Sequence, residues 1–410
     1  MASFSFGAGN AGKLLRIPLY AAGLLVTAVL PRRRDLWVFG CAVGLADGAW
    51  ALWQHAVTDG GERAVWLTGT SAEAADAARR GIPHAPKGSL RGFALTARAG
   101  VIVLTHGFGD VNRYAATGGT VVQLWHGIPL KRIGLDAPVT TDSPVPGLRR
   151  VLRALYRRTQ ARIRLLPAAS EIVRGRLESA FGLPDDRVPV TGEPRVDVLS
   201  RGSADERRRT ARAALAALDG ASGETRRVLY APTWRDGARD PAVPTAAQWA
   251  RIVALLEETD AILLVRSHPL GAGDYRPTPA TDRVRTLDSG VVADVTPLLP
   301  GMDALVTDYS SLAFDAALVP LPTVYFAPDL AEYAVGRGFY GTYADVAGAE
   351  PARDWESVVA ELRGVLTDDA HRAALAARSA TLSDRVHAFS DGQNTARVYA
   401  RIRAARDSES

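Results

Sequence analysis

The stretch DALVTDYSSLAFDAAL, residues 303–318, joins a short apolar run directly to a segment with the spacing of a helix. The run ALVTD (304–308) predicts a buried strand, and SSLAFDAAL predicts an amphipathic helix whose first turn carries Ser310 and Ser311. Strands that alternate with helices build parallel sheets. This stretch therefore predicts an α/β protein.

The same alternation runs along most of the chain in two series. Ala-rich and Arg-rich helical segments separate apolar runs that predict strands: LWVFG (36–40), AVWLT (64–68), VIVLT (101–105), VVQLW (121–125) and RLLPAA (164–169), then RVLYAPT (227–233), AILLVRS (261–267), ALVTD (304–308) and TVYFAPD (323–329). Between the series, residues 203–220 predict an exposed helix with Ser203 as N-cap and Gly220 as its end. Because 410 residues exceed one ordinary core, we expect two domains, 35–200 and 201–385.

Residues 1–34 have a pattern of their own. The apolar stretch LLRIPLYAAGLLVTAVL (14–30) is followed by PRRR (31–34). Its seventeen residues, interrupted by Arg16 and Pro18, are short for a bilayer span, which needs about 20 apolar residues. One interpretation is an interfacial helix flanked by basic residues that face an anionic membrane surface: Lys13, Arg16 and Arg32–Arg34. The protein is then expected to be a peripheral protein on the cytoplasmic face of the cell membrane. The other is a core helix of the first domain.

Composition and missing motifs exclude several kinds of site. With 49 Lys and Arg against 44 Asp and Glu, the net charge of +5 suits an anionic substrate, a membrane surface or nucleic acid equally. The single cysteine, Cys41, excludes an internal disulfide and a thiolate zinc site. The glycine fingerprint for dinucleotides, the phosphate loop and the nucleophile elbow are absent. Because these motifs are missing, we expect no cofactor, while a metal requirement stays open. Basic helices such as 149–164 have no interleaved aromatic beyond Tyr156, so we expect no nucleic-acid partner.

Polar side chains follow several predicted strands, and ligands of open α/β sheets bind beyond the carboxyl ends of the strands. VVQLW is followed by His126, and Lys131 and Arg132 come a few residues later. Because an imidazole titrates near neutral pH, His126 is a candidate general base for an alcohol. Lys131 and Arg132 would supply positive field for an anionic donor or acceptor.

Two further strand ends predict a phosphate site. Ser310 and Ser311 stand at a helix start, which suits a pyrophosphate, although helix capping alone explains them as well. In VRSHP, Arg266 and His268 return to the same side of the strand and offer cationic contacts to phosphoryl oxygens. A lone histidine is more often structural, and that alternative stays open for His268.

The ordered blocks of the chain resemble the CDP-glycerol glycerophosphotransferases of bacterial teichoic acid and capsule synthesis. The blocks that carry the resemblance are LWVFG, ADGAWALW (46–53), VVQLWHGIPLKRIG (121–134), VTGEPRVDVL (190–199), VLYAPTWRD (228–236), RSHP (266–269), DALVTDYSSLAFDAAL, TVYFAPDLAEY (323–333) and GRGFY (336–340). The resemblance implies two Rossmann-like domains facing across a cleft, the glycosyltransferase B arrangement, with the donor held mainly by the second. It also implies that a final helix within 386–410 crosses back to the first domain.

The resemblance assigns roles to individual residues. It makes His126 the base that deprotonates the acceptor hydroxyl, and it places His268 as a second catalytic residue near the donor pyrophosphate. Lys131 and Arg132 are expected to supply charge near the acceptor. Eight residues are expected to bind the donor and its phosphates: Pro232, Thr233, Arg235, Arg266, Asp308, Ser310, Ser311 and Asp315.

The expected reaction moves a polyol phosphate from CDP-glycerol or CDP-ribitol to a hydroxyl of a lipid-linked glycan or polymer acceptor, with release of CMP. Ile128, Gly48 and the pair Gly341 and Thr342 depart from the residues usual in the family, so the polyol stays open. Two alternatives remain at this stage. One is a glycosyltransferase B enzyme that uses a nucleotide sugar, and the other is a catalytically silent scaffold that binds nucleotide or polymer.

Overall fold

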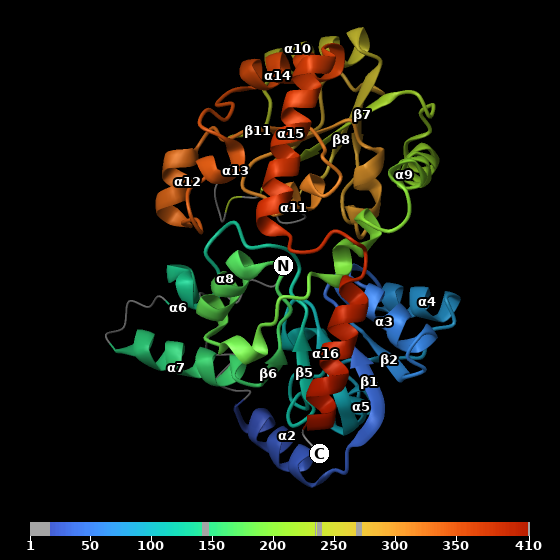
Figure 1. Cartoon of the computed structure of the whole chain (residues 1–410), viewed down its shortest axis with the longest axis vertical. Coiled ribbons are helices and arrows are strands. Elements are labelled where there is room, and N and C mark those ends of the chain that lie inside the picture. The colour runs from blue at the N-terminus through green and yellow to red at the C-terminus, as the bar shows by residue number, and fades with distance from the viewer. Residues whose placement is uncertain (1–16, 142–146, 234, 236–239, 268–272, 409–410) are drawn as a thin grey trace. The chain divides into compact units, whose positions relative to one another are not determined.

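The computed structural model describes residues 17–141, 147–233, 235, 240–267 and 273–408, and it shows a mixed α/β protein with two parallel sheets (Figure 1). The chain divides into two compact units. Unit 1 comprises Met1–His126, Arg132–Asp197 and Asp391–Ser410, and unit 2 comprises Gly127–Lys131 and Val198–Ser390. The α/β class and the parallel sheets expected from the sequence are confirmed.

The sheet of unit 1 has six parallel strands in the order β3-β2-β1-β4-β5-β6. Its strands are β1 (Arg33–Phe39), β2 (Arg63–Thr68), β3 (His84–Pro86), β4 (Ala99–Leu104), β5 (Thr120–Gln123) and β6 (Ile163–Leu165). Its helices are α2 (Ile17–Val29), α3 (Asp47–Thr58), α4 (Ser71–Arg79), α5 (Leu90–Arg98), α6 (Pro138–Thr141), α7 (Leu148–Gln160), α8 (Glu171–Phe181) and α16 (Asn394–Ser408). This order puts the topological switch point, where such sheets bind ligands, between β1 and β4.

The last helix of the chain, α16, completes the core of unit 1. Asp197 accepts hydrogen bonds from the backbone N–H groups of Asn394 (2.9 Å) and Thr395 (2.8 Å), so a carboxylate satisfies the free donors where the helix begins. Further along, Tyr399 stacks on Trp37 of β1 with ring centroids 5.6 Å apart. In Figure 1, α16 lies beside the strands of this sheet and next to α3.

The sheet of unit 2 has five parallel strands in the order β11-β10-β7-β8-β9. Its strands are β7 (Arg226–Ala231), β8 (Ala261–Val265), β9 (Val284–Thr286), β10 (Ala304–Thr307) and β11 (Thr323–Tyr325). Its helices are α9 (Ala204–Asp219), α10 (Ala246–Glu258), α11 (Leu312–Ala317), α12 (Leu330–Gly336), α13 (Ala344–Ala347), α14 (Trp355–Thr367) and α15 (Asp369–Val386). Here the switch point lies between β7 and β10.

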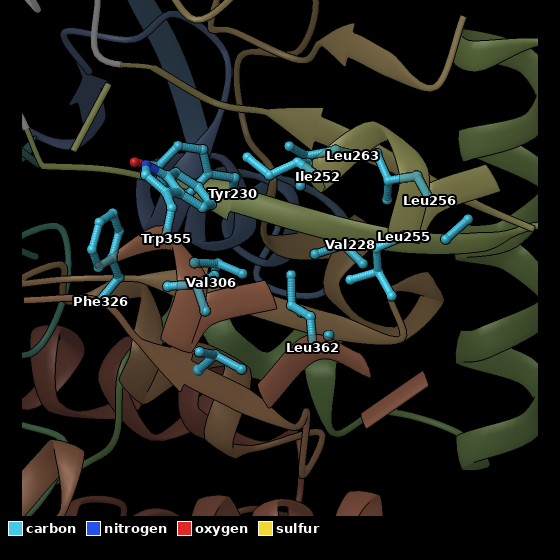
Figure 2. Packing of buried hydrophobic residues seen from close by; sticks show 14 of the residues in the cluster. Val228, Tyr230, Ile252, Leu255, Leu256, Leu263, Val306, Phe326, Trp355 and Leu362 are labelled. Carbon is cyan, nitrogen blue, oxygen red and sulfur yellow. The ribbon is translucent and has the colours of Figure 1, made fainter. Parts of the chain in front are cut away.

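The core of unit 2 forms where α10 and α14 pack over the central strands. Figure 2 shows Val228, Leu263 and Val306 of the sheet facing Leu255 of α10 and Leu362 of α14. All of these side chains are buried, which is why the parallel strands read as nearly continuous apolar runs in the sequence. The core thus fixes the ends of β7 and β10, on which the candidate site of this unit is built.

All nine strands expected from the apolar runs are present, and the helix expected over 203–220 is α9, with the Ser203 side chain as its N-cap and Gly220 at its end. Strands β3 and β9 were not expected from the sequence. Each is a three-residue edge strand, and their sequences, HAP and VRT, contain no apolar run that would predict them.

Helix α2 covers part of the apolar amino-terminal stretch. Its buried face is small: Gly23 lies against the backbone of Tyr114, and the Thr27 hydroxyl is 2.6 Å from that of Thr117. Its large apolar side chains face outward instead, with Leu25 71% and Val29 81% exposed. Within residues 17–408, apart from the undescribed gaps, no helix is long and apolar enough to cross a membrane. Lys13 and Arg16 lie outside the described residues.

Candidate active site

His126 lies at the carboxyl end of β5 on a distorted backbone. Trp125, which precedes it, has φ +62°, a left-handed conformation that is costly for a bulky residue and frequent at functional sites. The turn directs the imidazole against two other rings, with centroid distances of 4.2 Å to Trp125 and 4.5 Å to His106. The Nδ1 atom of His126 is buried and has no hydrogen-bond partner among the described residues.

The electrostatics around His126 favour its neutral form. The pKa of His126 lies well below the ordinary value for histidine, first because the ring is desolvated and then because of the positive charges of His106 and Arg195. A protonated ring would bury an N–H at Nδ1 without an acceptor. At neutral pH the side chain is therefore an unprotonated imidazole that can accept a proton.

His106 is a second histidine at this edge of the sheet, and the sequence analysis missed it. It follows β4, which borders the switch point, and its ring stacks on that of His126 with an interplanar angle of 11°. Its backbone is held by Asp110, whose Oδ2 accepts hydrogen bonds from the N–H groups of Thr105 (2.9 Å), His106 (2.6 Å) and Gly107 (3.2 Å). Its position just after the run VIVLT was the available signal.

A buried carboxyl and a buried guanidinium complete the charged groups in this part of unit 1. Glu193 and Arg195 lie in the block VTGEPRVDVL, and Glu193 is 3% exposed. Glu193 Oε2 is 4.0 Å from Arg195 Nε and has no hydrogen-bond partner among the described residues. Burial raises the pKa of Glu193 to about 6, although the charge of Arg195 opposes the shift. Neither residue was singled out from the sequence.

In unit 2, Arg235 is the centre of a hydrogen-bonded network at the switch point. Its Nε and Nη2 atoms donate to the two oxygens of Asp329 (2.7 and 2.8 Å), and Nη1 donates to Asp308 (2.9 Å). The guanidinium also lies over the rings of Tyr309 (5.0 Å) and Tyr333 (4.9 Å). Arg235 and Asp308 were predicted from the sequence, whereas Asp329, which follows the strand run TVYFA, was not.

Asp308 connects the two strands that border this switch point. It follows β10, and its Oδ1 accepts a hydrogen bond from the backbone N–H of Thr233 (2.9 Å), which follows β7. Burial raises the pKa of Asp308, although the Arg235 charge and these hydrogen bonds oppose the shift. The predicted donor residues Pro232 and Thr233 are both buried here, beside Arg235.

Lys131 belongs to the same cluster of unit 2, whereas Arg132 is exposed and belongs to unit 1. Lys131 pairs through its backbone with Phe339, and its Nζ lies 5.9 Å from the centroid of the Tyr333 ring. Desolvation lowers the pKa of Lys131 to about 8 against the opposing effect of Asp308. Lys131 is thus a cation that can lose its proton in the physiological range.

The helix start at Ser310 and Ser311 differs from the expectation. Helix α11 has only six residues and is buried over Ala313–Ala317, so it is not the amphipathic helix that the sequence predicts. It is covered because α15 packs against it. Ser311 makes no side-chain cap, while Ser310 Oγ accepts a hydrogen bond from the N–H of Leu312 (3.2 Å). Asp315 is buried in this helix.

The Arg266 side chain holds a loop of unit 2 through hydrogen bonds. Arg266 donates from Nη1 to the carbonyls of Leu287 (3.0 Å) and Val292 (2.8 Å), and from Nη2 to that of Ala293 (3.1 Å), so it ties down the loop after β9. His268 lies outside the described residues. The phosphate-binding roles of Arg266, Ser310, Ser311 and Asp315, and the catalytic role of His268, stay predictions.

Comparison with known proteins decides the family. The sequence pattern of the family described as CDP-glycerol:poly(glycerophosphate) glycerophosphotransferase matches residues 27–404. The chain belongs to this glycerophosphotransferase family. The resemblance seen in the sequence blocks is thereby confirmed.

Two relatives and one solved structure are similar to this chain. The teichoic acid glycerol-phosphate transferase of Staphylococcus aureus is 28% identical over 64% of this chain and 66% of its own length. The teichoic acid poly(glycerol phosphate) polymerase of Staphylococcus epidermidis is 30% identical over 55% of this chain, yet the match spans only 31% of that longer protein. The structure of the wall teichoic acid polymerase TagF superposes with a TM-score of 0.77 at 21% identity, covering 97% of this chain and 96% of that one, which shows a shared fold.

Proposed function

We propose that this chain transfers a polyol phosphate, with glycerol phosphate as the expected group, from a CDP-activated donor to a hydroxyl of a teichoic acid-like acceptor and releases CMP. The observation that carries the proposal is the family match over residues 27–404. The names of the two relatives, which both specify glycerol phosphate, favour CDP-glycerol over CDP-ribitol as the donor. A lipid-linked glycan or its growing polymer is the proposed acceptor.

In the proposed reaction, the acceptor oxygen forms a bond to the β-phosphorus of the donor while the bond from that phosphorus to the oxygen of CMP breaks. The proton of the acceptor hydroxyl goes to His126, and the electron pair of the broken bond leaves with CMP. His126 suits this role because its ring is neutral and only partly buried at the end of β5. A base with a lowered pKa suffices because phosphoryl transfer depends mainly on positioning and on charge stabilisation.

We propose that unit 2 binds the anionic donor. Lys131 and Arg235 gather beside the switch point between β7 and β10, where ligands of parallel sheets bind. At neutral pH, Lys131 carries its charge in most molecules because its pKa of about 8 lies above the pH. The charge can stabilise phosphoryl oxygens as they become more negative. That the two sheets face a shared cleft stays a prediction.

The first test measures CMP release by the purified protein with CDP-glycerol or CDP-ribitol and a lipid-linked disaccharide acceptor. Wild-type protein is expected to release CMP, and His126→Ala is expected to lose at least about 100-fold, the usual contribution of a proton-transfer group. His84→Ala is the matched control, because His84 lies in β3 at the far edge of the same sheet. It should keep wild-type activity.

Two outcomes would overturn parts of the proposal. If neither CDP-polyol gives CMP although both bind, polyol phosphate transfer is wrong, and UDP or GDP release from nucleotide sugars becomes the next measurement. If CMP is released equally by wild type and His126→Ala, the transfer stands and the role of His126 as base is wrong.

We also propose that α2 binds the cytoplasmic face of the cell membrane. Leu25 and Val29 expose large apolar surfaces, and the basic residues Arg32–Arg34 follow directly. Wild-type protein should therefore sediment with vesicles rich in phosphatidylglycerol but not with pure phosphatidylcholine vesicles. The double variant Leu25→Glu with Val29→Glu should bind at least about tenfold more weakly, since two buried aliphatic side chains stabilise binding by several kcal/mol.

Leu90→Glu is the control for this vesicle experiment. Leu90 is 90% exposed at the start of α5 in the same unit, so it matches the chemistry of the change at another place on the surface. If both variants bind vesicles as wild type does, the apolar face of α2 is not the membrane contact.

A further inference from the structure

The stacked pair His106 and His126 is built by the ends of two neighbouring strands. Strands β4 and β5 pair in parallel, with Leu104 opposite Gln123, so both histidines follow the same edge of the sheet. The left-handed turn at Trp125 and the carboxylate of Asp110 fix the two backbones independently. The rings lie nearly parallel, 11° apart, with centroids at 4.5 Å. At this distance two cationic rings would repel each other strongly, so the pair readily holds only one proton.

The groups around the pair decide which ring holds that proton. Burial lowers the pKa of His106, and the nearby buried carboxyl of Asp110 opposes this shift. The thiol of Cys41 also stands near, with its Sγ 3.9 Å from His106 Nδ1. Burial and Asp47 raise the pKa of Cys41, so this thiol stays neutral. On the other side, Arg195 lowers the pKa of both histidines.

His126 has much less support for a positive charge. Desolvation lowers the pKa of both rings. For His126 the main opposing influence within the described part of the chain is the backbone of Thr105, whereas for His106 it is the Asp110 carboxyl. Its Nδ1 also has no hydrogen-bond partner among the described residues. The first proton taken up by the pair as the pH falls therefore belongs on His106, beside Asp110.

We propose that His106 is a positioning residue for the reaction: by stacking on His126 and taking the first proton of the pair, it holds the His126 ring in place and keeps it unprotonated as the base. The inference rests on the proposed function, in which His126 deprotonates the acceptor. It goes further by explaining how the base stays available when the pH falls below neutral.

The test compares His106→Phe and His106→Asn with wild type in the full-length protein. Phenylalanine keeps a flat ring for stacking and cannot take a proton, whereas asparagine removes both the ring and the charge. The pKa of His126 is followed by NMR of labelled histidine C2–H groups without substrate, with His126→Ala to assign the signal. In both variants the pKa of His126 should rise by at least about 0.5 unit, because a neighbouring positive charge is lost.

The pH dependence of CMP release gives a second readout. With His106→Phe, activity near pH 8 should stay within about threefold of wild type. The acidic limb of the pH–rate profile should move to higher pH by about 0.5 unit, as the pKa of His126 does. His106→Asn should show the same shift and lower activity at every pH, because the ring that orients His126 is gone. His84→Phe, in β3, should change neither the pKa of His126 nor the profile.

The outcomes separate this inference from the proposed function. If CMP is released normally but neither folded variant changes the pKa of His126 or the profile, His106 has no such role and the transfer still stands. A fall in rate that is equal at all pH values for both variants also overturns it, since that marks a purely structural residue. If the NMR shift occurs while no CDP-polyol yields CMP, the coupling of the two rings is correct and the proposed function is wrong.

Discussion

The two units each contain a buried charged centre, and the two centres differ in how their charges are compensated. In unit 2, Arg235 donates hydrogen bonds to Asp308, Asp329 and the carbonyl of Thr233 and lies over two tyrosine rings. In unit 1, His126 Nδ1 and Glu193 Oε2 are buried without a hydrogen-bond partner in the described part of the chain. A satisfied network makes a rigid platform, whereas unsatisfied polar atoms cost stability and are expected where a substrate binds.

This difference fits the proposed roles of the two units. The proposed binding of an anionic donor by unit 2 needs fixed positive charge, and the carboxylates and tyrosines around Arg235 hold that charge in one geometry. The proposed role of His126 as a general base needs a free lone pair, which a neutral imidazole has. The comparison therefore predicts opposite effects on stability when a charge is removed from each centre.

The largest expected effect on the free energy of unfolding is at Arg235. Arg235→Met removes the cation and leaves Asp308 and Asp329 without it, so unfolding of unit 2 should become easier by about 3–5 kcal/mol. Arg235→Lys keeps the charge but loses the two-pronged contact with Asp329, and an intermediate loss is expected. Urea unfolding at neutral pH, monitored by fluorescence, measures both.

Arg251→Met is the matched control for Arg235. Arg251 also pairs with a carboxylate in unit 2, Glu356 at 3.2 Å, but both side chains are exposed, so the change should cost less than about 0.5 kcal/mol. If Arg235→Met costs no more than this control, the network around Arg235 is not the stabilising centre described here.

The sequence predicts the local parts of this arrangement and misses the parts that depend on tertiary structure. The nine strands that the sequence predicts lie within apolar runs, and His126 and Asp308 stand directly after two of these runs. His106 and Asp329 obey the same rule and could have been found by applying it to every strand.

Other features leave no local signal. Arg235 and Asp329 are 94 residues apart in the chain, so nothing in either segment specifies the pair. The burial of Glu193 depends on how its loop packs within unit 1. Helix α11 looks amphipathic in sequence because its polar Asp315 is not recognisable as buried until α15 is in place.

The smaller expected effect on the free energy of unfolding is at Glu193, where removing the charge should stabilise the protein. Its pKa in the folded protein is about 6, above the ordinary 4.5, so the folded state binds its proton more tightly than the unfolded chain does. The stability that this group contributes is present below pH 4.5 and is lost as the pH rises through about 6. A glutamine cannot ionise, so Glu193→Gln should raise the free energy of unfolding by about 2 kcal/mol at pH 7.

The pH dependence of the stability gained by Glu193→Gln shows whether the gain comes from the lost charge or from a change in packing. At pH 5 the gain should fall to about 1 kcal/mol, because Glu193 is then partly protonated in both states. Urea unfolding of wild type and variant at the two pH values measures it, with Glu171→Gln on the exposed surface of α8 as the control. An equal gain at both pH values would mean that the side-chain shape matters rather than the charge. A loss at pH 7 would mean that Arg195 compensates the carboxylate fully, and the contrast between the two centres would then fail in unit 1.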